Sequence, residues 1–466
     1  MGKRRGSYEG SDSEPGANAA GPSLTPASDI PLTDDEFAHR MDVLWPHGPF
    51  AVAVSGGCDS RALLDLAAAY ARTRSRTFTV LTVDHGLRGE SAREAQSVAE
   101  IARALDAPHV ILRWEGEKPR ANIEAAARAA RYGLMCAWCV AHGVGAILTA
   151  HTLNDQAETL IMRLARGSGV DGLSAMAERR DFAGVAIVRP LLDMPRARLR
   201  ARLEARAIGW LDDAMNEDTR YLRVRVRQAA PALAELGLTP ERLAATAQRM
   251  RRARIALDEM AGTVFAATVT VAPHGSCDVD LAALRAAPSE IGLRVLARVV
   301  MGVGGLVYRP RHDRLERLYR TLCEDGFEGD RTLAGCRIRP SGKHAVQVLR
   351  EAAMIEDVPV LLAGGETRLW DRRFAVSLRR GAALPGAEVR ALGALSTRAL
   401  EAAGGPLQPC AALLRATLPG LWVNGTLVSV PLLGFERPCG EYVAGAFHTR
   451  FVAFEGQNAS GGGSQA

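Results

Sequence analysis

Residues 50–60 read FAVAVSGGCDS, an apolar run that ends at two glycines and gives way to a helical pattern. The run from Phe50 to Val54 has the length and composition of a buried strand, and the apolar spacing from about residue 59 is helical. Glycines at such a junction allow a tight turn whose N–H groups point inward, and the helix N-terminus adds partial positive charge. The stretch therefore predicts a strand-to-helix loop that holds an anion.

The side chains beside the glycines narrow the kind of anion. Ser55 and Ser60 add hydroxyl donors, whereas Asp59 suits a phosphate only if a Mg²⁺ ion lies between the two. We therefore favour a metal-assisted nucleotide site over a bare phosphate pocket, and a plain tight turn is the alternative. The stretch fits neither the Walker pattern, which requires a lysine, nor the GxGxxG pattern of dinucleotide-binding folds.

Strands and helices alternate after this loop, which predicts an α/β fold with a doubly wound parallel sheet. Strands are expected at 50–54, 77–83, 109–113, 145–150 and 185–189, and helices from about 59 and at 91–105, 121–142, 154–166 and 196–207. Ligands of such sheets bind at the carboxyl ends of the strands. The strand exits are therefore the places where site residues are expected.

Composition divides the chain into five segments. We expect a disordered tail over 1–32, the α/β domain over 33–220, an arginine-rich helical region over 221–330, small β-rich modules over 331–455 and a flexible tail over 456–466. The α/β domain is expected to open with a helix, because Thr33 and Glu36 have the spacing of a capping box.

Charge and cysteine content limit the function classes. The chain of 466 residues has a formal charge of +6, a mild excess that permits a polyanionic partner. Only three of its 58 basic residues are lysines (Lys3, Lys118 and Lys343), which argues against a lysine nucleophile. No apolar run reaches the roughly 18 residues of a membrane helix, and eight scattered cysteines suit a reducing compartment, so we expect a cytoplasmic protein without membrane contact.

Two further strand exits carry polar residues. The second expected strand ends in VDHG, which places Asp84 and His85 near the same sheet edge, although a polar turn explains this segment equally well. After the fourth strand, Asp155 and Glu158 share one helix face and His151 lies one turn before them. This group suits an ammonium group, a Mg²⁺ ion or a transferable proton, and the alternative is an ordinary acidic helix start.

Two other patterns have both a functional and a structural interpretation. Arg220, Arg223, Arg225 and Arg227 alternate beside an aromatic residue, which suits contacts to phosphate but also a solvated helix face. The pair Cys136 and Cys139 forms a lone CxxC motif inside an expected amphipathic helix. For the cysteines we favour helix packing over a metal or redox role.

Several of these stretches occur together in one known family. SGGCDS resembles the loop of the N-type ATP pyrophosphatases. With VDHGLR, TAHTLNDQAETLIMRLARGSGVDGL, RPLL and WLDDAMNEDTRYLRVRVR it is similar, in order and spacing, to the tRNA(Ile)-lysidine synthetases. The resemblance covers about residues 48–230 well and thins beyond 240. Val224 departs from it, because this position carries an amide side chain in the family.

The resemblance implies a two-step ligation that uses ATP and Mg²⁺. ATP first adenylates the C2 oxygen of the wobble cytidine in the CAU anticodon of an isoleucine tRNA and releases pyrophosphate. The ε-amino group of free L-lysine then attacks C2 and expels AMP, which leaves lysidine. The helical and C-terminal regions are expected to bind the tRNA, and the resemblance is compatible with a homodimer.

The resemblance also assigns roles to residues. It assigns ATP binding to Ser55, Gly56, Gly57, Cys58, Asp59, Ser60, Asp84 and His85. Its catalytic candidates are Asp59, which is also the Mg²⁺ candidate, together with His151, Asp155, Glu158 and Arg223, and Arg227 is an alternative to Arg223. The resemblance leaves open which of these residues contacts lysine, base or ATP.

Two other enzyme classes and one non-enzymatic class compete with this interpretation. A tRNA thiolation enzyme with the same loop would use reactive cysteines, but the CxxC pair of this chain is expected inside a helix. An amidotransferase-like synthetase would carry a glutaminase signal, which is missing from this sequence. An RNA-binding module without activity is the third alternative.

Overall fold

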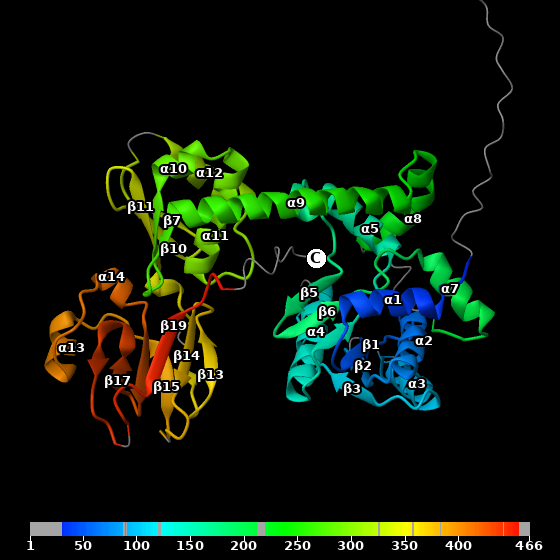
Figure 1. Cartoon of the computed structure of the whole chain (residues 1–466), viewed down its shortest axis with the longest axis horizontal. Coiled ribbons are helices and arrows are strands. Elements are labelled where there is room, and N and C mark those ends of the chain that lie inside the picture. Colours follow the sequence, from blue (N-terminus) through cyan, green and yellow to red (C-terminus); the bar gives the residue numbers. More distant parts are fainter. Residues whose placement is uncertain are drawn as a thin grey trace, which may run out of the picture. The chain divides into compact units, whose positions relative to one another are not determined.

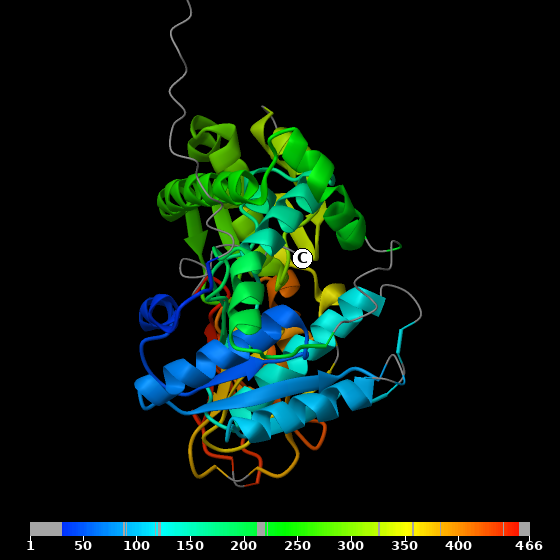
Figure 2. The same cartoon turned by 90° about the vertical axis from the view of Figure 1, so that its right-hand side faces the viewer.

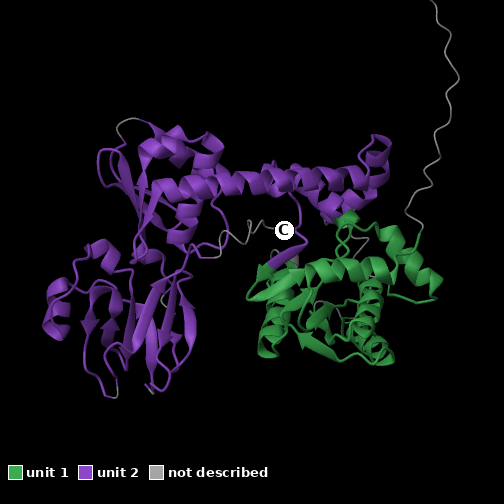
Figure 3. Ribbon diagram, in the orientation of Figure 1, with its two compact units in different colours: residues 1–155, 181–218 green, residues 156–180, 219–466 purple. Residues whose placement is uncertain are grey.

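The computed structural model describes residues 30–455 except 87–88, 90, 117, 120–122, 212–219, 221, 325–326, 357, 383 and 441. Most of both expected tails, and the DDAMNEDT and Tyr221 part of the arginine segment, thus lie outside the described residues. The chain forms two compact units (Figure 3): unit 1 comprises residues 1–155 and 181–218, and unit 2 comprises residues 156–180 and 219–466.

Unit 1 is built on a six-stranded sheet in the order β3-β2-β1-β4-β6-β5. The strands are β1 (Phe50–Ala53), β2 (Phe78–Asp84), β3 (His109–Arg113), β4 (Ala146–Leu148), β5 (Arg179–Phe182) and β6 (Val185–Val188). Strand β1 pairs in parallel with both β2 and β4. Strands β2 and β3 extend the sheet on one side of β1, whereas β4 and β6 extend it on the other side, so the winding direction reverses between β1 and β4. The doubly wound parallel sheet is therefore confirmed, and β5 is an edge strand that the sequence pattern did not predict.

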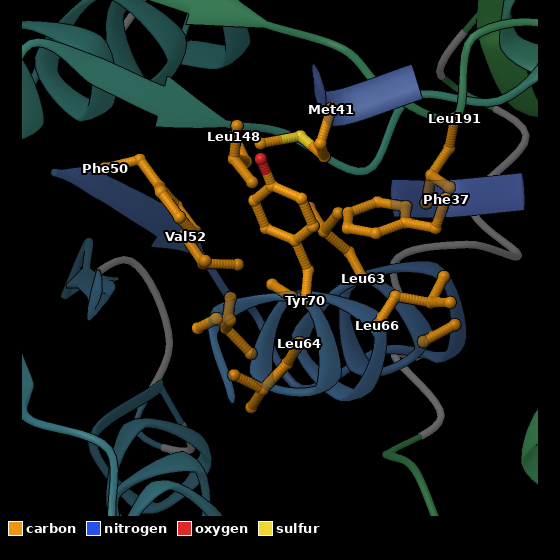
Figure 4. Packing of buried hydrophobic residues seen from close by; sticks show 14 of the residues in the cluster. Phe37, Met41, Phe50, Val52, Leu63, Leu64, Leu66, Tyr70, Leu148 and Leu191 are labelled. Atoms are coloured by element: carbon orange, nitrogen blue, oxygen red, sulfur yellow. The ribbon is translucent and has the colours of Figure 1, made fainter. Parts of the chain in front are cut away.

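Helices cover both faces of this sheet (Figure 1, Figure 2). They are α1 (Asp34–Leu44), α2 (Cys58–Thr73), α3 (Ser91–Ala104), α4 (Ile123–Ala141) and α7 (Arg196–Ala205), whereas α5 (Leu153–Leu164) starts in unit 1 and continues into unit 2. Because side chains alternate along β1, Phe50 and Val52 pack against α1 and α2 (Figure 4), whereas Ala51 faces α4. Cys136 and Cys139 of α4 pack against this second face of the sheet and are fully buried.

The expected capping box opens α1. The Thr33 hydroxyl accepts a hydrogen bond from the Glu36 N–H at 3.2 Å, and the Glu36 carboxylate accepts one from the Thr33 N–H at 3.0 Å. Both bonds satisfy N–H groups that a helix start leaves without a helical partner.

Unit 2 begins with helices and continues into a five-stranded antiparallel sheet. The helices are α6 (Val170–Leu173), α8 (Leu222–Glu235), α9 (Pro240–Thr268), α10 (Leu281–Ala286), α11 (Ser289–Gly304) and α12 (His312–Cys323). The sheet runs β7 (Val269–Val271), β8 (Cys277–Asp280), β11 (Ala345–Arg350), β10 (Cys336–Pro340), β9 (Arg331–Leu333). Strands from both sides of residue 330 thus share one sheet, and β7 and β8 lie in a region where only helices were expected.

The rest of unit 2 consists of two small sheets and short helices. The strands are β12 (Val360–Leu361), β13 (Thr367–Trp370), β14 (Phe374–Leu378), β15 (Ala387–Ala391), β16 (Pro419–Val423), β17 (Thr426–Val430), β18 (Phe435–Glu436) and β19 (Phe447–Phe451). Helices α13 (Thr397–Gly404) and α14 (Ala412–Arg415) lie between β15 and β16. This confirms the β-rich character of the C-terminal region. Among the described residues, no helix has the length and hydropathy required to span a membrane.

Candidate active site

The loop between β1 and α2 is tightly closed by its own hydroxyl groups. Gly57 is the N-cap of α2, and the Ser60 hydroxyl donates to the Gly57 carbonyl at 2.9 Å. The same hydroxyl oxygen accepts a hydrogen bond from the Ser55 N–H at 3.3 Å. These bonds fix the loop at the N-terminus of a helix of 16 residues, where its partial positive charge favours an anion.

Gly56 is required by its conformation and by its neighbour. Its φ of +92° lies in a region that disfavours residues with a Cβ. A Cβ on Gly56 would also lie 2.7 Å from Leu211 Cδ1, and the Leu211 N–H donates to the Gly56 carbonyl at 3.0 Å. The loop backbone is thus held from a second side by the segment that follows α7.

Asp155 belongs to α5, which follows β4, whereas the β1–α2 loop follows the neighbouring strand β1. Asp155 and the loop thus lie on opposite sides of the point where the sheet reverses its winding direction. Asp155 Oδ2 accepts hydrogen bonds from the Thr152 N–H at 2.7 Å and from the Thr152 hydroxyl at 2.9 Å. The side chain is 6% exposed. Asp155 therefore caps its own helix, and it does so next to the crevice where ligands of doubly wound sheets bind.

Arg196, the first residue of α7, joins Asp155 to the loop. Its Nε lies 2.8 Å from Asp59 Oδ2, and its Nη2 lies 2.9 Å from Asp155 Oδ1. Its backbone N–H donates to Asn154 Oδ1 at 2.9 Å. The structure thus brings two predicted residues, Asp59 and Asp155, onto one guanidinium group.

Arg196 was not predicted as a site residue from the sequence. A signal was present, because first helical turns favour acidic residues and α7 has none in its first turn. A basic residue at this position indicates an acidic partner, but the pattern does not say which one.

Glu158 lies in unit 2 and is held by two arginines of α8. Arg223 Nε lies 2.7 Å from Glu158 Oε2, and Arg227 Nε lies 2.7 Å from Glu158 Oε1. The Glu158 side chain is only 8% exposed. Arg225 points to solvent and Val224 is buried, so the alternating arginines divide between a carboxylate-binding face and an exposed face.

Asp84 and His151 make local contacts. Asp84 Oδ1 accepts hydrogen bonds from the Ser91 hydroxyl at 2.6 Å and from the Gly86 N–H at 3.1 Å, and the Ser91 bond is the main reason why the pKa of Asp84 is lowered. His151 Nδ1 lies 3.0 Å from the Thr149 hydroxyl. His85 follows Asp84 directly at the end of β2, beside β1 in the sheet.

The cysteines near the sheet are poor nucleophiles. Burial raises the pKa of Cys58 to about 11 and that of Cys136 to about 11, and it raises the pKa of Cys139 to about 12. A thiol that stays protonated at neutral pH neither attacks carbon nor binds metal readily. The CxxC pair thus belongs to the core under α4.

The loop and the doubly wound parallel sheet agree with the PP-loop class of proteins, and a family model described as PP-loop domain matches residues 34–233. The chain is 40% identical to the tRNA(Ile)-lysidine synthase of Ruegeria pomeroyi over 393 residues, which cover 84% of this chain and 90% of that protein. The tRNA(Ile)-lysidine synthase of Methylobacterium nodulans is 46% identical over 296 residues, covering 63% of this chain and 86% of that protein. That of Wolbachia pipientis wMel is 36% identical over 330 residues, covering 70% of this chain and 76% of that protein. The chain belongs to the tRNA(Ile)-lysidine synthase family.

Proposed function

We propose that this chain ligates L-lysine to C2 of the wobble cytidine in an isoleucine tRNA with the anticodon CAU. The observation that carries the proposal is the 40% identity to a tRNA(Ile)-lysidine synthase over 84% of this chain. The geometry supports it, because a helix N-terminus and two carboxylates lie at the crevice between β1 and β4.

The proposed reaction has two steps. In the first, the C2 oxygen of the cytidine attacks the α-phosphorus of ATP, an O–P bond forms, and pyrophosphate leaves. In the second, the neutral ε-amino group of lysine attacks C2, the bond from C2 to the adenylate oxygen breaks, AMP leaves, and the nitrogen gives up a proton. The wobble base must leave its stack to react, as is usual for single-stranded RNA loops.

The residues of the β1–α2 loop fit the binding of ATP phosphates. The loop leads into the N-terminus of α2, where free backbone N–H groups favour an anion, and Gly56 allows the turn there with its φ of +92°. Asp84 and His85, at the exit of the neighbouring strand, are proposed to contribute to the same nucleotide site.

Asp59 fits a Mg²⁺ ion that arrives with ATP. Asp59, Asp155 and Arg196 carry charges that sum to −1, which would repel phosphates unless a cation intervenes. Magnesium is usually bound by one or two carboxylates together with substrate phosphates, so a single acidic residue is a sufficient protein contribution. Bound there, the ion would neutralise charge on the phosphates.

Glu158 is proposed to bind the lysine substrate. Both of its carboxylate oxygens already accept a charge-assisted hydrogen bond from an arginine. Each oxygen keeps a further lone pair, so an ammonium group can contact the carboxylate without the loss of either bond. We therefore favour a positioning role for Glu158 over a general-base role, and His151 is the second candidate for the proton.

The comparisons and the cysteine environment disfavour the thiolation alternative. The family members reported above are named tRNA(Ile)-lysidine synthases. Cys136 and Cys139 are buried in α4, and burial raises the pKa of both thiols. No group of three or more His, Cys, Asp or Glu side chains that fits a metal ion occurs within the part of the chain that the structure describes.

The proposal is tested by incubating the protein with ATP, Mg²⁺, radiolabelled lysine and an isoleucine tRNA carrying CAU, beside a methionine tRNA. We expect label in the isoleucine tRNA alone and no label with Asp59→Ala. Pyrophosphate release without lysine incorporation would retain the ATP assignment and reject the nucleophile. Light scattering on the same preparation tests the proposed homodimer.

A further inference from the structure

Arg196 lies at a position that the reaction scheme above does not use. Strand β1 lies between β2 and β4 in the sheet. Helix α2 follows β1 and helix α5 follows β4, so the two helices start on either side of the crevice between β1 and β4. Asp59 belongs to the first turn of α2 and Asp155 to the first turn of α5. One guanidinium group from α7 reaches both carboxylates, at 2.8 and 2.9 Å.

We infer that Arg196 is a positioning residue for ATP: it ties the starts of α2 and α5 together across the crevice in which the nucleotide binds. This inference rests on the proposed function for the identity of the nucleotide. It assigns a task to a residue that neither the loop motif nor the reaction scheme includes.

The bonding pattern favours positioning over simple charge neutralisation. A guanidinium group presents its N–H donors in a rigid planar fork, so its Nε and Nη2 fix the distance and the angle between two acceptors. A lysine ammonium group at the same place would carry the same charge without that fixed geometry. Charge and geometry can therefore be separated by substitution.

The other contacts of α5 and α7 leave little freedom to this arrangement. The Thr152 N–H donates to the second oxygen of Asp155, Oδ2, at 2.7 Å. The backbone N–H of Arg196 donates to Asn154 Oδ1 at 2.9 Å. The side chain of Asp155 is 6% exposed, whereas those of Asp59 and Arg196 are 23% and 29% exposed. Asp155 is thus the fixed anchor, and Arg196 transmits that position to the more exposed Asp59.

Arg200 is a matched control on the same helix. It lies one turn after Arg196 and pairs with Glu204 at 2.9 Å, and both of these side chains are more than half exposed. A surface pair of this kind contributes little to stability. Arg200→Met therefore removes an arginine of α7 without changing the bridge.

The test measures equilibrium binding of Mg·ATP, without tRNA or lysine, and pyrophosphate release with tRNA in a single turnover. We expect Arg196→Met and Arg196→Lys to weaken ATP binding by about tenfold, since each loses charge-assisted hydrogen bonds. We expect pyrophosphate release to slow by about 100-fold, because the loop is no longer held in register. Arg200→Met should match the wild type in both measurements.

A double-mutant cycle identifies the path of the effect. In an Asp155→Asn background, Arg196→Lys should cause a much smaller loss than in the wild type, because the ion pair between residues 155 and 196 is already lost. Wild-type ATP binding by Arg196→Lys, or an equal loss in both backgrounds, would overturn the inference. Arg196→Lys carries the test even if Arg196→Met does not fold.

The ATP-binding measurement also separates this inference from the proposed function. If the wild type binds ATP in an Arg196-dependent way but makes no lysidine, the proposed function fails and the role of Arg196 stands. If lysidine forms and Arg196→Lys binds ATP normally, only the role of Arg196 fails.

Discussion

At the scale of single residues, the pairing of Glu158 with Arg223 and Arg227 determines what this carboxylate can do. We expect Arg223→Met and Arg227→Met each to lower kcat/KM for lysine by about tenfold or more, since a hydrogen bond to a charged group contributes about 1.5–3 kcal/mol. Single-turnover pyrophosphate release should fall less, because the proposed ATP site is the β1–α2 loop and does not include Glu158. Arg225→Met, on the exposed face of the same helix, is the control. Equal losses in both steps would reject a lysine-specific role.

Asp84 provides a pH prediction. The Ser91 hydroxyl and the Gly86 N–H lower the pKa of Asp84 in the folded state. A lowered pKa contributes stability that is present above the unfolded value of about 3.9 and is lost as the pH falls through the folded value. The difference in unfolding free energy between wild type and Asp84→Asn should thus be constant from pH 7 to 5 and shrink below about pH 4. Urea titrations at these pH values test this, and a difference that grows in acid would contradict it.

Cys58 distinguishes ligation from thiolation at the residue scale. Burial, with a smaller effect of the neighbouring Asp59, raises the pKa of Cys58 to about 11. The thiol therefore stays protonated at neutral pH and is a poor nucleophile. Cys58→Ser should keep lysidine synthesis within about threefold of the wild type, which labelled lysine measures. Complete loss of activity with intact ATP binding would restore a sulfur-based mechanism.

At the scale of elements, Arg294 joins three helices of unit 2. It donates to Asp171 of α6 at 2.7 Å, to Asp258 of α9 at 2.6 Å and to Glu290 of α11 at 2.9 Å, and its side chain is 3% exposed. Arg309 would still pair with Asp171 and Asp258, and the acids are 31–50% exposed, so we expect Arg294→Met to cost about 1–3 kcal/mol through its lost hydrogen bonds. Chemical denaturation should show this loss, whereas the exposed Arg314→Met on α12 should change stability by less than about 0.5 kcal/mol. A loss for Arg294→Met below about 1 kcal/mol would show that the acids find other partners.

The elements also show which parts of the molecule the sequence pattern could predict. The helix start at Thr33 and the turn after β1 depend on neighbours within a few residues, so local patterns were sufficient for them. Arg196 bonds to Asp59, which is 137 positions away from it in the chain, and to Asp155, which is 41 positions away. No local pattern specifies such partners. Strand β8 is only four residues long and pairs with β11 more than 60 positions later, so it was hidden in a helical region.

At the scale of the whole molecule, unit 2 is connected through residues far apart in sequence. Phe454 packs against Phe265 of α9, with ring centroids 5.2 Å apart, although most of unit 2 separates them in the chain. Asp371 pairs with Arg350 at 2.9 Å and with Arg373 at 2.6 Å. The C-terminal sheets are thus joined to α9 by the aromatic contact and to the β7–β11 sheet by the buried ion pair between Asp371 and Arg350. A truncation that tests tRNA recognition must respect these contacts.

Two truncations separate folding from recognition. Removal of residues 331–466 would take away β9, β10 and β11 and leave β8 without its central partner, so we expect a partly unfolded protein. Removal of residues 357–466 keeps all five strands of that sheet but takes away the contact of Phe454 with Phe265, and Arg350→Leu added to it removes the charge that Asp371 would no longer pair. Since unit 1 has its own core, both proteins should bind ATP like the wild type. The second should bind tRNA more weakly and with a shallower dependence on salt, because phosphate contacts are lost. Unchanged tRNA affinity and salt dependence would assign recognition to the remaining residues, where the exposed arginines of α9 are the next candidates.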